Sequence, residues 1–162
     1  MLGPRQAGKT TLLRELTKAR QLDALWWNGD EPDIRGLLSN ASSTQLKSLI
    51  GDKKIIVIDE AKSIENIGLT LKLIYDTISD CKVIGTGSSS FELANRINEP
   101  LTGRKWEYFL HPVSYEEMVN HHGLLEERRL LEQRLIYGYY PEVVTTPGHE
   151  KETLNQLSDS YL

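Results

Sequence analysis

Three short apolar runs stand out in the first half of the chain, at residues 24–27, 54–58 and 82–84. The second run, Lys54-Ile-Ile-Val-Ile58, is continuously apolar after its first residue. Runs of this length and continuity are typical of parallel strands that are buried on both faces. Each run ends in polar or turn-forming residues, so we expect three strands of one sheet.

Between these runs, apolar positions recur every three or four residues, which is the spacing of amphipathic helices. The first of these stretches places Leu12, Leu13 and Leu16 along one face of a helix. Strands that alternate with helices predict an α/β fold with a mostly parallel sheet. The helices expected from the spacing cover residues 10–20, 34–38, 43–50 and 67–78.

Two serine–glutamate pairs have the spacing of a capping box, in which each side chain accepts a hydrogen bond from the other residue's main chain. Ser89 and Glu92 predict a helix from about residue 91 to 97. Ser114 and Glu117 predict the start of a mostly helical region that continues through the rest of the chain. Between them, residues 106–110 alternate like an edge strand.

Gly3 to Thr10, with the sequence Gly-Pro-Arg-Gln-Ala-Gly-Lys-Thr, matches the P-loop or Walker A pattern G-x-x-x-x-G-K-[ST] and runs directly into the first expected helix. Curled main-chain N–H groups and the positive end of that helix would hold a polyphosphate. Lys9 would reach the β- and γ-phosphates, and the Thr10 hydroxyl would ligate Mg²⁺. The alternative is a chance glycine turn, for which average residue frequencies give odds of roughly one in a hundred or lower. The residues expected to bind nucleotide are Gly3, Pro4, Arg5, Gln6, Ala7, Gly8, Lys9, Thr10 and Thr11.

Two adjacent carboxylates, Asp59 and Glu60, follow the strand at residues 54–58. At this position Asp59 would hold Mg²⁺ together with Thr10, as in a Walker B strand. Glu60 would then polarise the water that attacks the γ-phosphate, which favours hydrolysis over passive binding. The alternative is an ordinary transition from strand to loop.

Five segments, in order along nearly the whole chain, resemble the prokaryotic AAA+-type ATPases in which this core precedes a C-terminal domain of unknown function. The resemblance implies an AAA+-like P-loop NTPase with a three-layer α/β/α core, ATP and Mg²⁺ as cofactors, and ATP hydrolysis. It divides the chain into an ATPase core at residues 1–112 and a helical lid or linker at residues 113–162. The five segments are Gly3–Leu12, Val57–Glu60, Thr86–Ser90, Leu101–Arg104 and Tyr140–Val144.

The same resemblance implies roles for residues further along the chain. Ser88 aligns with the polar sensor of the γ-phosphate, with Thr86 as the second choice. Arg104 aligns with an arginine finger that reaches the nucleotide of a neighbouring copy. The alternatives are a serine run that only caps a helix and an arginine on a surface loop. The chain departs from the family at Lys62, where glutamine is usual, and at Tyr139, where glycine is usual.

The ends of the chain also bear on the expected fold. Only Met1 and Leu2 precede Gly3, so the first strand, which AAA+ proteins place in the middle of the sheet, is expected to be largely missing. The last residues begin a helix where the resembling proteins continue. We therefore expect a piece of a larger protein that lacks its C-terminal domain and that binds ATP weakly or is poorly stable alone.

Composition narrows the function classes. The chain has 162 residues, a formal net charge of −4 and one cysteine, Cys81, which excludes an intramolecular disulfide. No apolar run approaches the roughly 20 residues that span a bilayer, and no export signal opens the chain. We expect a cytoplasmic protein without membrane contact, and the acidic balance does not favour DNA-directed work.

The leading functional hypothesis is an ATPase that drives rearrangement of an attached domain or partner, as a single copy or a homo-oligomer. The alternative from another class is a nucleotide-dependent switch with negligible turnover. Two polar clusters in the C-terminal part, His121-His122 and Glu126-Glu127-Arg128-Arg129, are expected to be solvated helix surfaces. Tyr139 is expected only to repack a loop.

Overall fold

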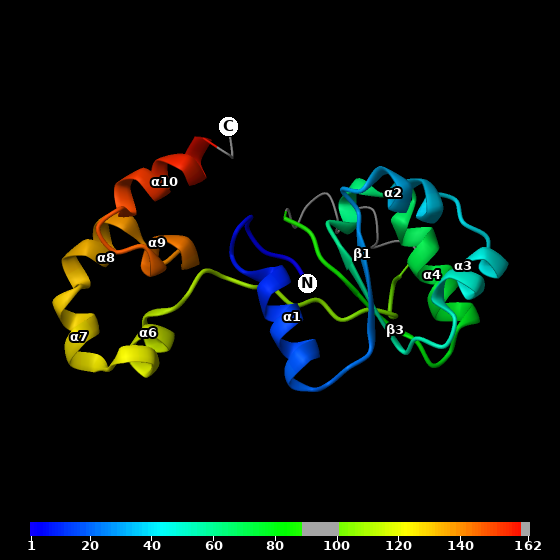
Figure 1. Ribbon diagram of the computed structural model, residues 1–162, viewed down its shortest axis with the longest axis horizontal. Coiled ribbons are helices and arrows are strands. Elements are labelled where there is room, and N and C mark those ends of the chain that lie inside the picture. The colour runs from blue at the N-terminus through cyan, green and yellow to red at the C-terminus, as the bar shows by residue number, and fades with distance from the viewer. Residues whose placement is uncertain (89–100, 160–162) are drawn as a thin grey trace. The chain divides into compact units, whose positions relative to one another are not determined.

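A computed structural model of the chain describes residues 1–88 and 101–159 (Figure 1). Contacts divide these residues into two compact units. The first unit contains Met1–Gly3 and the described part of Lys9–Phe109, and the second contains Pro4–Gly8 and the chain from Leu110 onward.

The first unit is built on a parallel sheet of three strands in the order β1-β2-β3. The strands are β1 (Ala24–Asn28), β2 (Ile55–Asp59) and β3 (Lys82–Gly85), each within two residues of the expected run. Asn28 pairs with Asp59, and Ile58 pairs with Gly85, so the carboxyl ends of all three strands meet at one edge of the sheet. The predicted α/β class and parallel sheet are therefore confirmed.

Leu2 lies between the residues that follow β3 and the segment around Phe109. It forms isolated parallel bridges to Gly87 on one side and to Phe109 on the other, and its N–H donates to Tyr108 O at 2.8 Å. The edge strand expected over residues 106–110 is wrong in extent, because within the described chain only Phe109 makes a bridge. Because its partner is the single residue Leu2 and not a strand, this segment does not form a run of paired residues.

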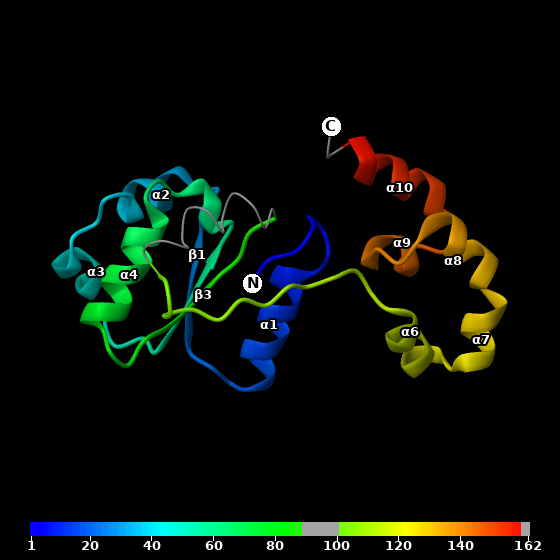
Figure 2. The same ribbon diagram turned by 180° about the vertical axis from the view of Figure 1, so that it is seen from behind.

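Helices cover both faces of the sheet, which gives the three layers of an α/β/α core (Figures 1 and 2). One layer is α1 (Lys9–Ala19). Its buried positions are Lys9, Leu13 and Thr17, while Leu12 and Leu16 of the apolar face are exposed. The other layer consists of α2 (Pro32–Leu38), α3 (Ser43–Ile50) and α4 (Ile67–Thr77), with the short 3-10 turn η1 (Ala61–Ser63) before α4.

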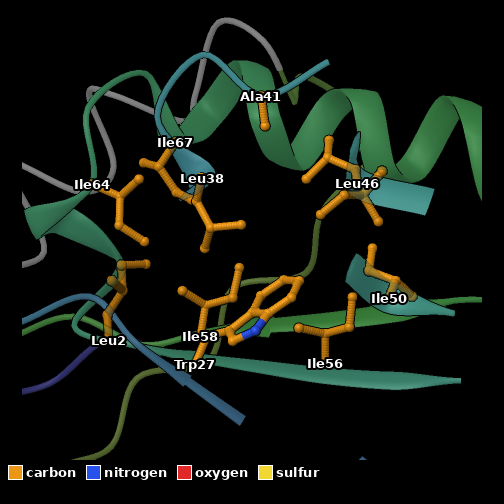
Figure 3. Close-up of a cluster of buried hydrophobic side chains, with 12 residues drawn as sticks. Leu2, Trp27, Leu38, Ala41, Leu46, Ile50, Ile56, Ile58, Ile64 and Ile67 are labelled. Carbon is orange, nitrogen blue, oxygen red and sulfur yellow. The ribbon is translucent and has the colours of Figure 1, made fainter. Parts of the chain in front are cut away.

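The main hydrophobic core lies between the sheet and α2–α4 (Figure 3). Ile56 and Ile58 of β2 face it and are fully buried, as strand alternation requires. Val57, between them, is also fully buried but belongs to the opposite face. A strand buried on both faces explains its continuously apolar sequence and fixes the position of Asp59 at its end. The core residues are Leu2, Trp27, Leu38, Ala41, Leu46, Ile50, Ile56, Ile58, Ala61, Ile64, Ile67 and Ile74.

The second unit is helical, as expected. Ser114 and Glu117 form the predicted capping box in full, so this prediction is confirmed. The other pair, Ser89 and Glu92, and the helix expected over residues 91–97 lie outside the described residues. No helix in the described ranges combines the length and apolarity that crossing a membrane requires. The helices are α6 (Tyr115–His122), α7 (Leu124–Arg129), α8 (Leu131–Tyr137), α9 (Pro141–Thr145) and α10 (Glu150–Asp159).

The second unit contains a buried carboxylate, that of Glu127 in α7. This carboxylate accepts hydrogen bonds from the Tyr139 hydroxyl at 2.7 Å, from His122 Nε2 at 2.8 Å and from Arg134 Nε at 3.4 Å. Glu127 has no exposed surface, so the expected solvated face over residues 126–129 is wrong at this position. Tyr139 does more than repack a loop, because its hydroxyl satisfies a buried charge. Burial and the nearby Glu127 raise the pKa of Tyr139 to about 12.

Candidate nucleotide-binding site

The loop from Gly3 to Gly8 turns sharply before α1. The Ala7 N–H donates to Pro4 O at 3.4 Å, and the φ angles of Gln6 and Gly8 are 59° and 91°. A Cβ at Gly8 would meet no atom within 4 Å, so glycine is needed there for its backbone angle and not for space. Arg5 and Gln6 are exposed. The loop leads directly into Lys9, the first residue of α1, as the P-loop pattern predicts.

The Lys9 ammonium is held inside the protein. Its Nζ donates to Gly3 O at 2.9 Å, and only 6% of the residue is exposed. Burial lowers the pKa of Lys9, while the charges of Glu60 and then Asp59 oppose this shift and Lys62 adds to it. Two cations and two carboxylates of the first unit are therefore close enough to influence one another.

Asp59 joins two hydroxyl groups at the carboxyl edge of the sheet. Its Oδ2 accepts a hydrogen bond from Thr10 Oγ1 at 2.7 Å, and its Oδ1 accepts one from Thr86 Oγ1. The Thr86 hydroxyl also accepts a bond from the Glu60 N–H at 3.2 Å, and Thr86 is fully buried. The structure thus brings together Thr10 and Asp59, the two expected metal ligands, and adds Thr86, the second choice for the sensor.

Glu60 has an unusual backbone for a residue with a side chain. Its φ and ψ are 46° and 45°, in the left-handed region, at the start of η1. Sparsely populated backbone angles of this kind persist only when the surroundings enforce them, and they cluster at functional sites. Its Oε2 is buried and has no hydrogen-bond partner, and the nearest ammonium, that of Lys62, is 3.9 Å away.

Gly29, in the turn after β1, lies close against this backbone. Its N–H donates to Asp59 O at 2.8 Å. A Cβ at Gly29 would lie 2.3 Å from Glu60 O and 3.2 Å from Asp59 O, so no other residue fits without displacing the two carboxylate residues. In the sequence Gly29 reads only as part of a turn, and its role depends on the contact between two strand ends.

Ser88, the first choice for the sensor, contacts Lys62 and not Asp59. Lys62 Nζ donates to Ser88 Oγ at 2.6 Å. Lys62 is the position at which the chain departs from the family that it resembles, and it lies between Glu60 and Ser88. Sequence reasoning noted the departure but did not place Lys62 in the site.

Arg104, the candidate arginine finger, lies against α4. Its Nε is 3.7 Å from Asp76 Oδ1, and its guanidinium lies 5.9 Å from the centre of the Tyr75 ring. A helix that connects two parallel strands runs back along them, so Asp76, near the carboxyl end of α4, is at the amino edge of the sheet. Asp59 is at the opposite edge, and the structure does not bring Arg104 to it within one chain.

The residues present fit Mg²⁺ and a nucleotide phosphate. Mg²⁺ prefers oxygen ligands, and Asp59 and the Thr10 hydroxyl are already within hydrogen-bond distance of each other. Since Thr10 uses its proton to bond Asp59, the lone pairs of its oxygen can bind a metal. The Lys9 ammonium is held by a main-chain carbonyl, for which an anionic phosphate oxygen would be the stronger partner.

Comparisons with known proteins agree with this geometry. The family model described as the AAA domain matches residues 1–119. This range includes Lys9, Thr10, Asp59 and Thr86. No curated protein matches the chain. Because the match covers most of the chain and includes both the phosphate loop and the carboxylate strand, the chain belongs to the AAA-type P-loop ATPase family.

Proposed function

We propose that this chain binds ATP with Mg²⁺ and hydrolyses it to ADP and phosphate, and that the reaction drives rearrangement of an attached domain or partner. Family membership gives the coarser statement, a nucleotide-binding function of ATPase type. The observation that carries the proposal is the Thr10–Asp59–Thr86 hydrogen-bond chain beside the buried Lys9 ammonium.

In this proposal the loop and the first turn of α1 bind the phosphates. The main-chain N–H groups of residues Gly3 to Thr11, except at Pro4, would bind the β- and γ-phosphates together with the positive end of the α1 dipole. Lys9 exchanges Gly3 O for phosphate oxygens, which offsets the cost of burying its charge. Bound Mg²⁺ supplies charge neutralisation between the phosphates, and Thr10 and Asp59 are the residues that would hold it.

Glu60 is proposed as the group that orients and deprotonates the attacking water. Its backbone is fixed by Thr86 and Gly29, so its carboxylate starts from a defined position near Lys9. Positioned general bases contribute about 10²- to 10⁴-fold to rates. Ser88 and Thr86 are the candidates for sensing the γ-phosphate, and Arg104 is the candidate for acting on a neighbouring copy in a homo-oligomer.

One observation favours a second candidate, a nucleotide-dependent switch with negligible turnover. The Oε2 atom of Glu60 is buried and its nearest cation is Lys62, so in this conformation that oxygen is not in contact with water. A protein in which neither carboxylate oxygen of Glu60 reached water with nucleotide bound would hold ATP without cleaving it.

The test is an ATPase assay on the whole protein, with Lys9→Ala and Glu60→Gln beside the unaltered protein. The proposal expects turnover above background, loss of binding in Lys9→Ala, and retained binding with turnover reduced about 100-fold or more in Glu60→Gln. Binding without measurable turnover in the unaltered protein would favour the switch. Turnover unchanged in Glu60→Gln would remove Glu60 from its proposed role.

A further inference from the structure

We infer that Lys62 is a positioning residue for Glu60, held in place by Ser88. The inference rests on the proposed function, since it deepens the role given there to Glu60. It concerns a residue to which neither the family match nor the phosphate-binding pattern assigns a role.

The geometry places one ammonium between two groups of the site. Lys62 Nζ donates to Ser88 Oγ at 2.6 Å and lies 3.9 Å from Glu60 Oε2. Both charged side chains are largely shielded, with 20% of Lys62 and 27% of Glu60 exposed. Ser88 follows β3 and Glu60 follows β2, so Lys62 connects the ends of two neighbouring strands.

Glu60 needs such a partner for a physical reason. A buried carboxylate oxygen without a hydrogen bond is unstable unless a charge compensates it. Among the described residues, Oε2 of Glu60 has no hydrogen-bond partner, and Lys62 is the cation paired with it. Lys9 also interacts with Glu60 electrostatically, but its Nζ is directed to Gly3 O. The ammonium of Lys62 therefore keeps this oxygen turned inward.

The attraction to Lys62 acts on the side chain and not on the backbone of Glu60. The main-chain N–H of Glu60 bonds Thr86 and its carbonyl lies close to Gly29, and neither contact involves the Lys62 side chain. Loss of the Lys62 charge should therefore release the carboxylate while the phosphate-binding groups stay in place. A residue that acts in this way changes kcat and leaves nucleotide affinity unchanged.

The first measurement compares kcat and Mg·ATP affinity of the whole protein in three variants. Lys62→Gln keeps a donor for Ser88 but removes the charge, and we expect kcat to fall about tenfold or more, with Kd changed less than twofold. Lys62→Arg keeps the charge and should stay within about threefold of the unaltered kcat. Lys54→Gln is the matched control, because Lys54 forms an exposed pair with Asp80 at the other edge of the sheet.

The second measurement needs no turnover. In the nucleotide-free protein, Lys62→Gln should lower the melting temperature by about 2–4 °C, and the same change in the Glu60→Gln background should shift it far less, because the carboxylate that Lys62 compensates is already gone. Equal shifts in both backgrounds would show that Lys62 does not act through Glu60 and would overturn the inference.

The two measurements separate the inference from the proposed function. If Lys62→Gln shifts the melting temperature less in the Glu60→Gln background and the protein has no turnover, the link between Lys62 and Glu60 is upheld and hydrolysis is contradicted. A hydrolysing protein in which Lys62→Gln leaves kcat unchanged, or lowers affinity and kcat together, would contradict the inference and uphold hydrolysis.

Discussion

Thr10 Oγ1 donates a 2.7 Å hydrogen bond to Asp59 Oδ2, between residues that are 49 positions apart in the sequence. Thr10 lies in the first turn of α1, and Asp59 is the last residue of β2. This contact joins the first turn of α1 to the carboxyl end of β2. In the proposed function, the oxygen atoms of these two residues would bind Mg²⁺.

The buried charge of Lys9 should lower the stability of the nucleotide-free protein. Because burial lowers the pKa of Lys9, the folded state disfavours its charged form at neutral pH. Lys9→Met, which keeps the apolar stem, should therefore raise the free energy of unfolding by about 1 kcal/mol while it abolishes ATP binding. Urea unfolding without nucleotide measures the first effect. A Lys9→Met protein less stable than the unaltered one would show that the ammonium is a structural group.

Gly29 should tolerate no side chain. Its Cβ would lie 2.3 Å from Glu60 O, so Gly29→Ala must displace the residues that carry both carboxylates. We expect a loss of about 1–3 kcal/mol of stability and a loss of turnover that exceeds the loss of binding.

The control for this change is Gly36→Ala. A Cβ at Gly36, which lies within α2, meets no atom within 4 Å. This variant should be unchanged or more stable by about 0.5–1 kcal/mol. Comparable losses in the two variants would contradict the close approach of Gly29 to Glu60.

Thr86 should matter more for the metal than for folding. Thr86→Val removes the hydroxyl that donates to Asp59 and accepts a hydrogen bond from the Glu60 N–H. It should lower the free energy of unfolding by about 1–3 kcal/mol. Thr70→Val is matched in burial and removes a bond to Leu38 O at 2.9 Å. Only Thr86→Val should weaken the Mg²⁺ dependence of nucleotide binding, measured by titration with and without the metal. Equal effects of the two variants on that dependence would contradict a site role for Thr86.

The elements of the first unit could be predicted because local pattern determines them. Ile56, Val57 and Ile58 form an apolar run that fits only a strand buried on both faces, and Gly8, Lys9 and Thr10 follow a fixed pattern. The segment from Trp106 to Leu110 has the right alternation for a strand, yet it pairs only at Phe109. Its pairing depends on a neighbouring strand, which residues 106–110 alone do not reveal.

Parts of the site depend on contacts between distant residues, and these could not be predicted. Whether Thr86 or Ser88 faces Asp59 is decided by the register of β2 against β3, which a single sequence does not contain. Glu127 lies in a charged stretch typical of a helix surface, and its burial depends on Tyr139, twelve residues away. A polar side chain is buried where partners converge on it, so its local pattern is a poor guide.

Tyr139 should stabilise the second unit through Glu127 in a pH-dependent way. Tyr139→Phe removes the hydrogen bond to the charged Glu127 carboxylate. It should lower the free energy of unfolding by about 1.5–3 kcal/mol. The pKa of Tyr139 is raised to about 12 from 10, so its contribution is complete below pH 10 and is lost as the pH rises towards 12. The free energy of unfolding is measured for the unaltered protein and for Tyr139→Phe, at pH 8 and above pH 10. The difference between the two proteins should be smaller at the higher pH.

Tyr137→Phe is the control for this effect. Tyr137 is the last residue of α8 and is half-buried like Tyr139, but it is not among the donors to Glu127. Its replacement should change stability by less than about 0.5 kcal/mol at either pH. A gap between the unaltered protein and Tyr139→Phe that stays constant above pH 10 would contradict the raised pKa.

Arg104 should affect turnover only between copies of the chain. If it acts on a neighbouring nucleotide, kcat rises with protein concentration, and Arg104→Ala lowers it about 1,000-fold. Asp76→Asn weakens the exposed ion pair but leaves the guanidinium, so it should retain activity. Turnover that is independent of concentration and survives in Arg104→Ala would leave Arg104 as a partner of α4 alone.

Calorimetric titration of the whole protein with ATP, with and without Mg²⁺, tests the central claim most directly. The account predicts one binding site per chain, tighter with Mg²⁺ present, weakened by Thr10→Val and absent in Lys9→Met. No heat with Mg·ATP or any other nucleoside triphosphate, or binding that Lys9→Met leaves intact, would contradict it.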